Sequence, residues 1–274
     1  MKRTKKTMCV ACLTAMACLT PIGAQTLPDG KEWDDILVTH VNRELAHALA
    51  IPEGYSLTLD GQWKFKWVGM PSQASAAWCA AGFNDGAWEN IDVPSSWQVW
   101  GLQHGKTWDK PLYVNVGYPF EYDRQTYSIM ATRPGWFTYS GTMSNPVATY
   151  RRTFTLPDTW DGREVYARFH GVGAGYYLWV NGTRVGYSED SYTPAEFRIT
   201  PYLKEGENSM ALQVYRFTGG SFLECQDYWR LTGIQRHCLL WSAPKTQIRD
   251  YFFTTDLDDD YVNATARVEV TVTG

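Results

Sequence analysis

Cysteine is scarce beyond the first 24 residues of this chain of 274 residues. Only Cys79, Cys225 and Cys238 occur there, and their spacing is not that of a metal-binding motif. At most one disulfide could form among them, which excludes a small scaffold held together by disulfides. The five histidines show neither an HxH nor an HExxH pattern, so no zinc site is predicted.

Long apolar runs are also lacking. A weakly apolar run covers residues 8–22, and it is too short to cross a membrane as a helix. Four basic residues precede this run, and the small residues Gly23 and Ala24 follow it. We therefore predict that residues 1–24 are a signal peptide and that the protein is periplasmic or secreted. The alternative is a lipoprotein anchored through a cysteine of this segment, but neither Cys12 nor Cys18 has a leucine three residues before it.

An excess of positive charge is absent as well. The formal net charge is -4, and removing the four positive charges of residues 1–24 takes it to -8. Such an acidic surface repels phosphate backbones, so nucleic acid is excluded as a partner.

Aromatic residues are abundant: 13 Trp, 17 Tyr and 11 Phe make up 15% of the chain. Large aromatic side chains fill the space between packed sheets, and they also form platforms for the apolar faces of sugar rings. For any single aromatic residue, core packing is the stronger interpretation.

Short alternating runs dominate from residue 57 onward. In the segment 165–170, apolar residues alternate with Tyr, Arg and His, the period of a half-buried strand. Asn181 and Gly182 separate two further runs and predict a type I′ hairpin turn. No long amphipathic helix interrupts this pattern, which favours an all-β antiparallel sandwich. Segments 208–217 and 234–241 are predicted strands, residues 32–47 an extended arm and residues 119–147 an ordered surface loop.

A second β unit is predicted after Trp241. Pro244 marks the boundary, and alternation resumes at 248–254 and again at 262–272. An immunoglobulin-like sandwich needs about 100 residues, so the sequence predicts a fragment that ends inside a domain. The predicted division is signal peptide 1–24, arm 25–52, sandwich 53–243 and truncated second domain 244–274.

Five phrases of the sequence, in order, resemble glycoside hydrolase family two, and the β-galactosidase branch in particular. They are LDGQWKF at 59–65, VPSSWQ at 93–98, LYVNVGYPF at 112–120, LWVNGTRVGYSEDSYTPAEF at 178–197 and QDYWRLTGIQR at 226–236. The phrase at 226–230 resembles the galactosidase branch more than the β-glucuronidase branch. The resemblance implies a jelly-roll-like, galactose-binding-domain-like sandwich, an immunoglobulin-like domain, and then a (β/α)₈ barrel that carries the chemistry.

The same resemblance implies two site residues. Asn115 would hydrogen-bond a galactose hydroxyl, whereas Asp227 would bind the 6-hydroxyl region and ligate a sodium ion shared with the barrel. These roles suit an amide, which both donates and accepts, and a carboxylate, which is a hard ligand for a hard cation. From spacing alone, Asn115 could instead be a turn residue, and Asp227 could cap backbone groups or pair with Arg230.

No catalytic residue is predicted in this chain. A retaining glycosidase needs two carboxyl groups about 5 Å apart. Glu224 with Asp227, and Glu189 with Asp190, are close in sequence, but neighbours on a strand point to opposite faces. The resemblance places the catalytic carboxylates, and any magnesium site, in the barrel. Trp97 and Trp229 are candidate walls for the sugar, although both lie in alternating sequence, which favours core or interface packing.

Three functions remain open at this stage. The first is the N-terminal part of an enzyme that hydrolyses terminal β-D-galactosides, with a β-galactoside sugar as the partner and a homo-oligomeric parent left open. The second is a free-standing, non-catalytic carbohydrate-binding module. The third is an interaction domain in which residues 32–47 bridge subunits.

Overall fold

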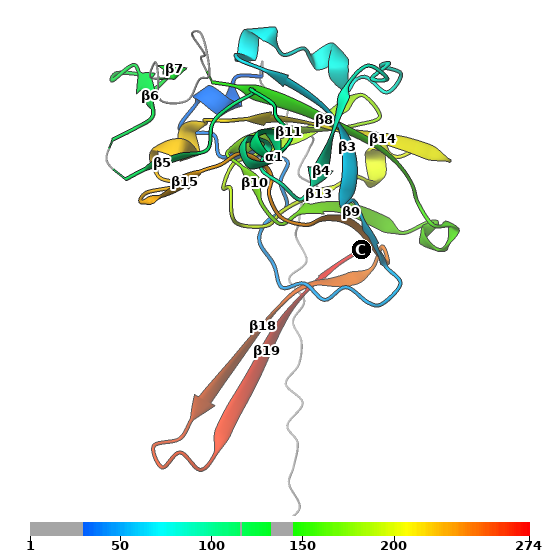
Figure 1. Ribbon diagram of the computed structural model, residues 1–274. Helices are drawn as coiled ribbons and strands as arrows, with labels where there is room; N and C mark the ends of the chain where they lie inside the picture. The colour runs from blue at the N-terminus through cyan, green and yellow to red at the C-terminus, as the bar shows by residue number, and fades with distance from the viewer. Residues whose placement is uncertain (1–29, 116, 133–144) are drawn as a thin grey trace, which may run out of the picture.

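The structure is a computed structural model, and it describes residues 30–115, 117–132 and 145–274. The predicted signal peptide lies outside the described residues, as do residues 133–144 of the predicted surface loop. Two antiparallel sheets stack to form the body of the molecule (Figure 1), which confirms the predicted all-β sandwich. Within the part that the structure describes, the helices are too short or too polar to cross a membrane.

The two main sheets contain seven and four strands. The larger sheet has the order β1 (His40–Val41), β12 (Thr183–Ser188), β11 (Gly175–Val180), β14 (Glu207–Tyr215), β8 (Val147–Thr155), β3 (Gly61–Val68), β4 (Glu89–Val93). The smaller sheet has the order β13 (Ala195–Arg198), β9 (Glu164–Phe169), β17 (Cys238–Ala243), β2 (Ser56–Thr58).

Eight shorter or separate strands pair in twos. These pairs are β10 (Val172–Gly173) with β16 (Gly233–Ile234), β15 (Tyr228–Arg230) with β5 (Leu112–Val114), β6 (Phe120–Tyr122) with β7 (Ile129–Thr132), and β18 (Gln247–Leu257) with β19 (Ala264–Thr273). The helices of the described residues are α1 (Trp97–Gln103) and the 3₁₀ turns η1 (Glu32–Asp34), η2 (Pro71–Gln73), η3 (Ala76–Cys79), η4 (Asp158–Trp160), η5 (Thr200–Tyr202) and η6 (Gly219–Phe222).

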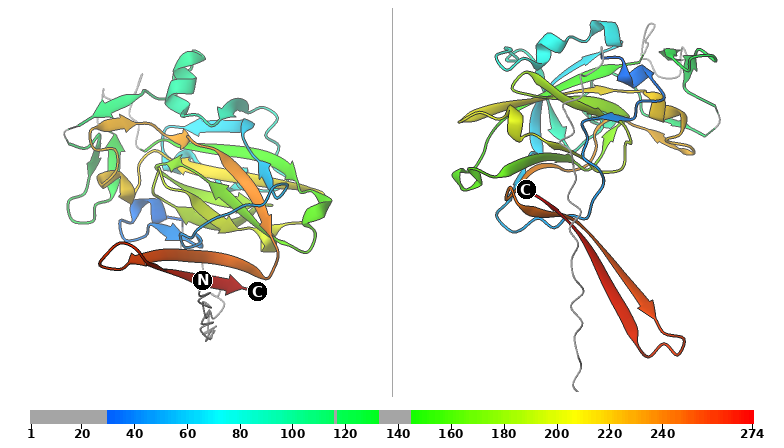
Figure 2. Two further views of the ribbon diagram at one scale, coloured as in Figure 1. Left: turned by 90° about the horizontal axis from the view of Figure 1, so that it is seen from below. Right: turned by 180° about the vertical axis from the view of Figure 1, so that it is seen from behind.

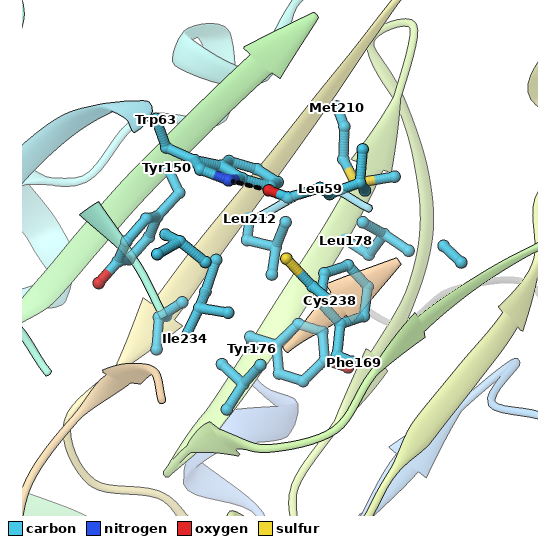
Figure 3. Close-up of a cluster of buried hydrophobic side chains, with 14 of the residues drawn as sticks. Leu59, Trp63, Tyr150, Phe169, Tyr176, Leu178, Met210, Leu212, Ile234 and Cys238 are labelled. Carbon is cyan, nitrogen blue, oxygen red and sulfur yellow. Dashed lines mark hydrogen bonds between the residues drawn. The ribbon is translucent and has the colours of Figure 1, made fainter. Parts of the chain in front are cut away.

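The main core lies between the two sheets. Leu178 and Leu212 from the larger sheet meet Phe169 from the smaller one, and all three are buried (Figure 3). The indole of Trp63 is also buried, and its Nε1 donates to the backbone oxygen of Leu59 at 2.8 Å. That bond satisfies the polar atom of a large side chain, which would otherwise be costly to bury. Many of the aromatic residues belong to this core or to the three smaller apolar clusters.

Local signals in the sequence predicted several strands correctly. Asn181 and Gly182 have φ values of 50° and 82° and join β11 to β12, as a type I′ turn requires. In β9, Val165, Ala167 and Phe169 face the core as predicted. The opposite face of β9 is not solvated, however, because Tyr166 is buried in a second cluster.

The N-terminal arm causes this extra burial. It is extended apart from η1, as the sequence predicts, and β1 adds to the edge of the larger sheet beside β12. Farther along, Leu49 and Ile51 pack against Tyr166 and Trp241. The arm therefore lies on its own sandwich.

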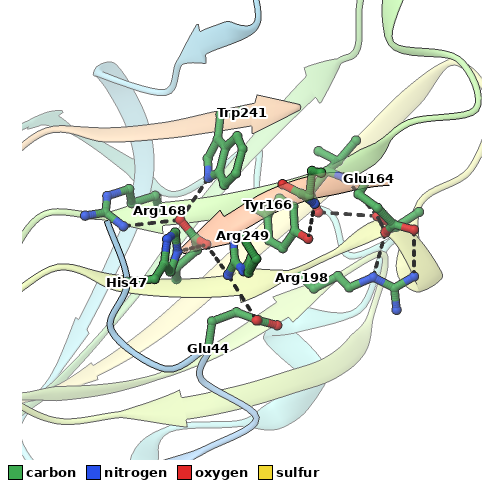
Figure 4. A network of polar contacts seen from close by, with 12 residues as sticks. Glu44, His47, Glu164, Tyr166, Arg168, Arg198, Trp241 and Arg249 are labelled. Atoms are coloured by element: carbon green, nitrogen blue, oxygen red, sulfur yellow. Dashed lines mark hydrogen bonds and ion pairs between the residues drawn. The ribbon is translucent and has the colours of Figure 1, made fainter. Parts of the chain in front are cut away.

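A buried carboxylate ties the arm to the sandwich and to β18. Oε1 of Glu196, on β13, lies 3.0 Å from Nε2 of His47 and accepts from Nη2 of Arg249 at 2.7 Å. Its Oε2 accepts from Nε1 of Trp241 at 2.8 Å and from Nη1 of Arg168 at 3.2 Å (Figure 4). We call this group the Glu196 cluster. It joins three segments that are distant in the sequence.

The hairpin of β18 and β19 projects from the body of the sandwich (Figure 1; Figure 2, right). It begins after the predicted boundary and contains the two alternating runs that the sequence indicated. Apolar side chains on both of its faces are exposed, among them Tyr251, Phe252, Phe253, Val268 and Val270.

Candidate functional site

The ribbon of β5 and β15 brings together the two residues that the sequence analysis nominated. Its last pair is Tyr228 opposite Val114. Asp227 directly precedes Tyr228 and Asn115 directly follows Val114, so the two side chains leave adjacent points at one end of the ribbon. Both residues are exposed. β5 and β15 lie side by side at one edge of the sandwich (Figure 1).

The outer face of this ribbon also carries two aromatic side chains. Tyr113 pairs with Trp229 across the strands, and the rings meet edge to face with centroids 6.0 Å apart. They are 46% and 50% exposed. Asn115 and Asp227 directly adjoin the strands that carry this aromatic pair, so the four residues gather at one end of the ribbon. We call these four residues the polar corner.

One hydrogen bond links the aromatic pair to the acidic residue. The hydroxyl of Tyr113 donates to Oδ1 of Asp227, and this bond raises the pKa of Tyr113. Within the described residues, Oδ2 of Asp227 and the amide of Asn115 make no hydrogen bond. The corner therefore offers unused donors and acceptors at a solvent-exposed surface, beside aromatic rings, which is the chemistry that binds polyhydroxylated molecules.

The inner side of the ribbon is anchored in a buried polar group. Asp109 and Arg216 form an ion pair whose side chains are both 0% exposed. Oδ2 of Asp109 also accepts from Nε1 of Trp97 at 3.2 Å and from Nε2 of Gln98 at 3.1 Å. The Gln98 oxygen in turn accepts from the backbone nitrogen of Thr232 at 2.9 Å, just after β15. These bonds make the base of the ribbon rigid.

The loop before β15 determines the backbone conformation of Asp227 and therefore the orientation of its side chain. Asp227 and Cys225 both have left-handed backbone conformations, with φ values of 54° and 57°. Such values are uncommon for residues other than glycine and are kept where the surrounding structure enforces them. Here Glu224 provides an anchor, because its carboxylate accepts from the backbone nitrogen and hydroxyl of Ser191 at 2.8 and 2.5 Å.

Glu189 is buried and Glu224 is half-buried, and both carboxyl groups lie near Gly220, but their surroundings do not suit glycoside cleavage. Burial raises the pKa of Glu189 to about 7, against hydrogen bonds from Tyr187 and the Gly220 backbone. The cavity that Glu224 lines has a volume of about 10 Å³, room for roughly one water molecule. A sugar ring cannot enter between these two groups.

The two tryptophans nominated as candidate walls differ from one another. Trp97 is buried, as the packing interpretation requires, but it begins α1 rather than lying in a strand. The side-chain oxygen of Ser96 accepts from the Val99 nitrogen at 3.4 Å and caps the N-terminus of this helix. The helix has only seven residues and is surrounded by strand-forming sequence, so this capping signal is easy to miss. For Trp229 the core part of that prediction is wrong, because the side chain is half exposed on the ribbon; packing at an interface stays a prediction.

Tyr113 is the residue of the corner that sequence reasoning missed. It stands two positions before Asn115, within the same motif. An alternating strand places both side chains on one face, and this pattern could have indicated it.

A sodium ion is compatible with the corner by the chemistry of its donors. Asp227 offers one carboxylate oxygen that no described residue engages, and a hard oxygen suits this hard cation. Among the residues that the structure describes, no group of three His, Cys, Asp or Glu side chains is placed to hold a metal by itself. The remaining ligands would have to come from elsewhere.

Comparison with known proteins identifies the sandwich. Residues 57–244 match the family model described as "Glycosyl hydrolases family 2, sugar binding domain". The β-galactosidase of Priestia megaterium is 38% identical over 238 residues, covering 82% of this chain and 22% of that protein. That of Vibrio cholerae is 41% identical over 216 residues, covering 79% and 19%. The chain thus spans about a fifth of the length of these curated relatives.

Solved structures share the fold at lower identity. A β-glycosidase from Bacteroides vulgatus aligns with a TM-score of 0.55 and 23% identity, over 80% of this chain and 24% of that one. A β-glucuronidase from an uncultured Clostridium species aligns with a TM-score of 0.56 and 18% identity, over 84% and 36%.

Fold and sequence therefore agree on the class of domain: residues 57–244 form a β-sandwich that matches the sugar-binding domain of glycosyl hydrolase family 2. The chain belongs to glycosyl hydrolase family 2.

Proposed function

We propose that this chain is the sugar-binding part of a longer β-galactosidase, and that its polar corner helps to form the pocket for a terminal β-D-galactosyl unit. One observation carries the proposal: Asn115 and Asp227 are adjacent and exposed, and both have hydrogen-bonding atoms that no described residue engages. Relatives named β-galactosidases at 35–41% identity support galactose over glucuronic acid. The likeness to β-glucuronidases concerns the fold.

In the proposed complex, the corner binds and orients the sugar. The Asn115 amide donates to one hydroxyl and accepts from another, while the free oxygen of Asp227 accepts from the 6-hydroxyl. Holding the sugar in one pose converts binding energy into correct alignment of the scissile bond. The acid and the nucleophile would lie in a (β/α)₈ barrel outside this chain, so we expect residues 25–274 alone to show no turnover.

We further propose that Asp227 supplies one ligand of a sodium ion, with the other protein ligands in the barrel. A bound cation there would attract the oxygen of the galactosyl 6-hydroxyl. A magnesium site, if the parent has one, belongs to the barrel as well. The hairpin of β18 and β19 would be the beginning of an immunoglobulin-like domain, and residues 1–24 would direct export to the periplasm or beyond.

The test compares Asp227→Ala with the wild type in the full-length protein. With an aryl β-D-galactoside, we expect kcat/KM to fall at least a hundredfold, because a charged hydrogen bond and the cation ligand are both lost. Sodium dependence should also disappear. Asp161→Ala is the matched control, because Asp161 is an exposed aspartate in the turn before β9. Unchanged kinetics and an unchanged response to sodium in Asp227→Ala would contradict the proposal.

A further inference from the structure

Tyr113 is joined to both parts of the polar corner. Its hydroxyl donates to Oδ1 of Asp227, and its ring meets that of Trp229, its partner in the strand register, in an edge-to-face arrangement. Tyr113 lies on β5, whereas Asp227 and Trp229 come from the loop and strand of β15. The bond therefore spans the ribbon and holds the loop residue against the neighbouring strand.

We propose that Tyr113 is a positioning residue: its hydroxyl fixes one carboxylate oxygen of Asp227 so that the other points to the galactosyl hydroxyl or the cation. This inference rests on the proposed function of Asp227. It adds a residue whose role is to hold the ligand-binding group rather than to touch the sugar.

Physical reasons favour this role. An exposed aspartate side chain rotates freely, and ordering it on binding lowers affinity. A hydrogen bond formed before the ligand arrives removes much of that cost. The phenol suits the task because its aromatic ring is rigid and its hydroxyl can donate a hydrogen bond to a carboxylate. Trp229 in turn restricts the ring of Tyr113.

The opposite face of the ribbon supplies a matched control. Tyr228 is the neighbour of Trp229 in sequence, so its side chain leaves the other side of β15, where its ring meets that of Tyr192 at 5.8 Å. It is exposed to a similar extent, and within the described residues its hydroxyl has no hydrogen-bond partner. Tyr228→Phe removes a hydroxyl from the same ribbon without touching Asp227.

The first experiment measures kcat/KM of the full-length protein with an aryl β-D-galactoside and an aryl β-D-fucoside, which lacks the 6-hydroxyl. In Tyr113→Phe, the value for the galactoside should fall about tenfold, as expected for losing a hydrogen bond to a charged group. The value of kcat/KM for the fucoside should change less than about twofold, because the fucoside has no 6-hydroxyl to donate a hydrogen bond to Asp227. The sodium concentration for half-maximal activity should rise. Tyr228→Phe should leave all three quantities unchanged.

A double-mutant cycle separates positioning from direct contact. Tyr113→Phe in the Asp227→Ala background should have no further effect, because the residue acts through that carboxylate. An effect of the same size in both backgrounds would overturn the inference and make Tyr113 a sugar contact. An equal loss for galactoside and fucoside would also overturn it, since that is general damage to the site.

The outcomes also distinguish the inference from the proposed function. If Asp227→Ala has no effect, the proposed function itself fails. If Asp227→Ala is severely impaired while Tyr113→Phe stays within about twofold of the wild type, only the positioning role fails.

Discussion

Two carboxylates of this sandwich make opposite uses of the same chemistry. Glu196 is 3% exposed in its side chain and has partners at both oxygens: His47, Arg168, Arg249 and Trp241. Asp227 is exposed, and among the residues that the structure describes its partner is Tyr113, at one oxygen. A buried carboxylate must be saturated with donors to remain charged, whereas an exposed one can keep an oxygen free.

This difference indicates what each group is for. The Glu196 cluster joins the arm, the sandwich and β18, and no oxygen is left for a ligand. The polar corner keeps its unused atoms at the surface, on a ribbon that buried bonds hold in place. We therefore expect substitutions in the first group to lower stability and substitutions in the second to lower binding.

The largest effect on stability is expected for Glu196→Ala. Removing this carboxylate leaves the largely buried guanidinium of Arg168 without its anion and leaves Arg249 with only Glu44 among the described residues, and it should cost about 3–5 kcal/mol of unfolding free energy. Urea unfolding of the 274-residue chain measures it. Asp227→Ala, the exposed counterpart, should change the same quantity by less than about 0.5 kcal/mol. Equal losses in the two variants would contradict the division of roles.

The second largest effect on stability is expected at acid pH, where Glu196 becomes protonated. Burial alone would raise the pKa of Glu196, but the hydrogen bond to His47 and the charge of Arg249 outweigh burial and lower it to about 2. An acid with a depressed folded pKa stabilises the fold above its unfolded pKa, about 4.5, and loses that contribution as the pH falls toward 2. Between pH 6 and 3, the urea midpoint should fall more steeply in the wild type than in Glu196→Gln, which cannot titrate. Parallel pH profiles would refute this.

A smaller loss of stability is expected as the pH rises through the pKa of His47. The hydrogen bond to Glu196 raises the pKa of His47 against the effect of burial. The stability that this bond contributes is present below the unfolded value of about 6.5 and is lost as the pH rises through the higher folded value. We expect a loss of about 1 kcal/mol. His47→Gln keeps a donor that does not titrate, so its stability should be flat over the same range; an equal decline in both proteins would exclude His47 as the cause.

The parts of the fold that follow local rules could be predicted from the sequence. The turn at Asn181 and Gly182 and the inward face of β9 depend on neighbouring residues alone. The burial of Tyr166 depends on the arm, which is over a hundred residues away in the sequence, and alternation carries no such information. The same is true of the Glu196 cluster, whose members come from separate segments.

The candidate site shows the same limit. Motif resemblance nominated Asn115 and Asp227, but the hydrogen bond from Tyr113 depends on the register between β5 and β15. No local pattern fixes that register, because the strands are three residues long and more than a hundred residues apart. The sequence predicts a strand at Trp97, because one or two turns of helix are too short to give a recognisable helical period.

The most direct test of the polar corner is a crystal structure of the full-length protein with a bound galactoside. We predict that Asp227 lies within hydrogen-bond distance, about 3.2 Å, of the galactosyl 6-hydroxyl oxygen or of a cation that contacts it, with the Asn115 amide on a neighbouring hydroxyl. A sugar bound in the pocket with both side chains more than about 6 Å away, beyond even a bridging water, would contradict the account.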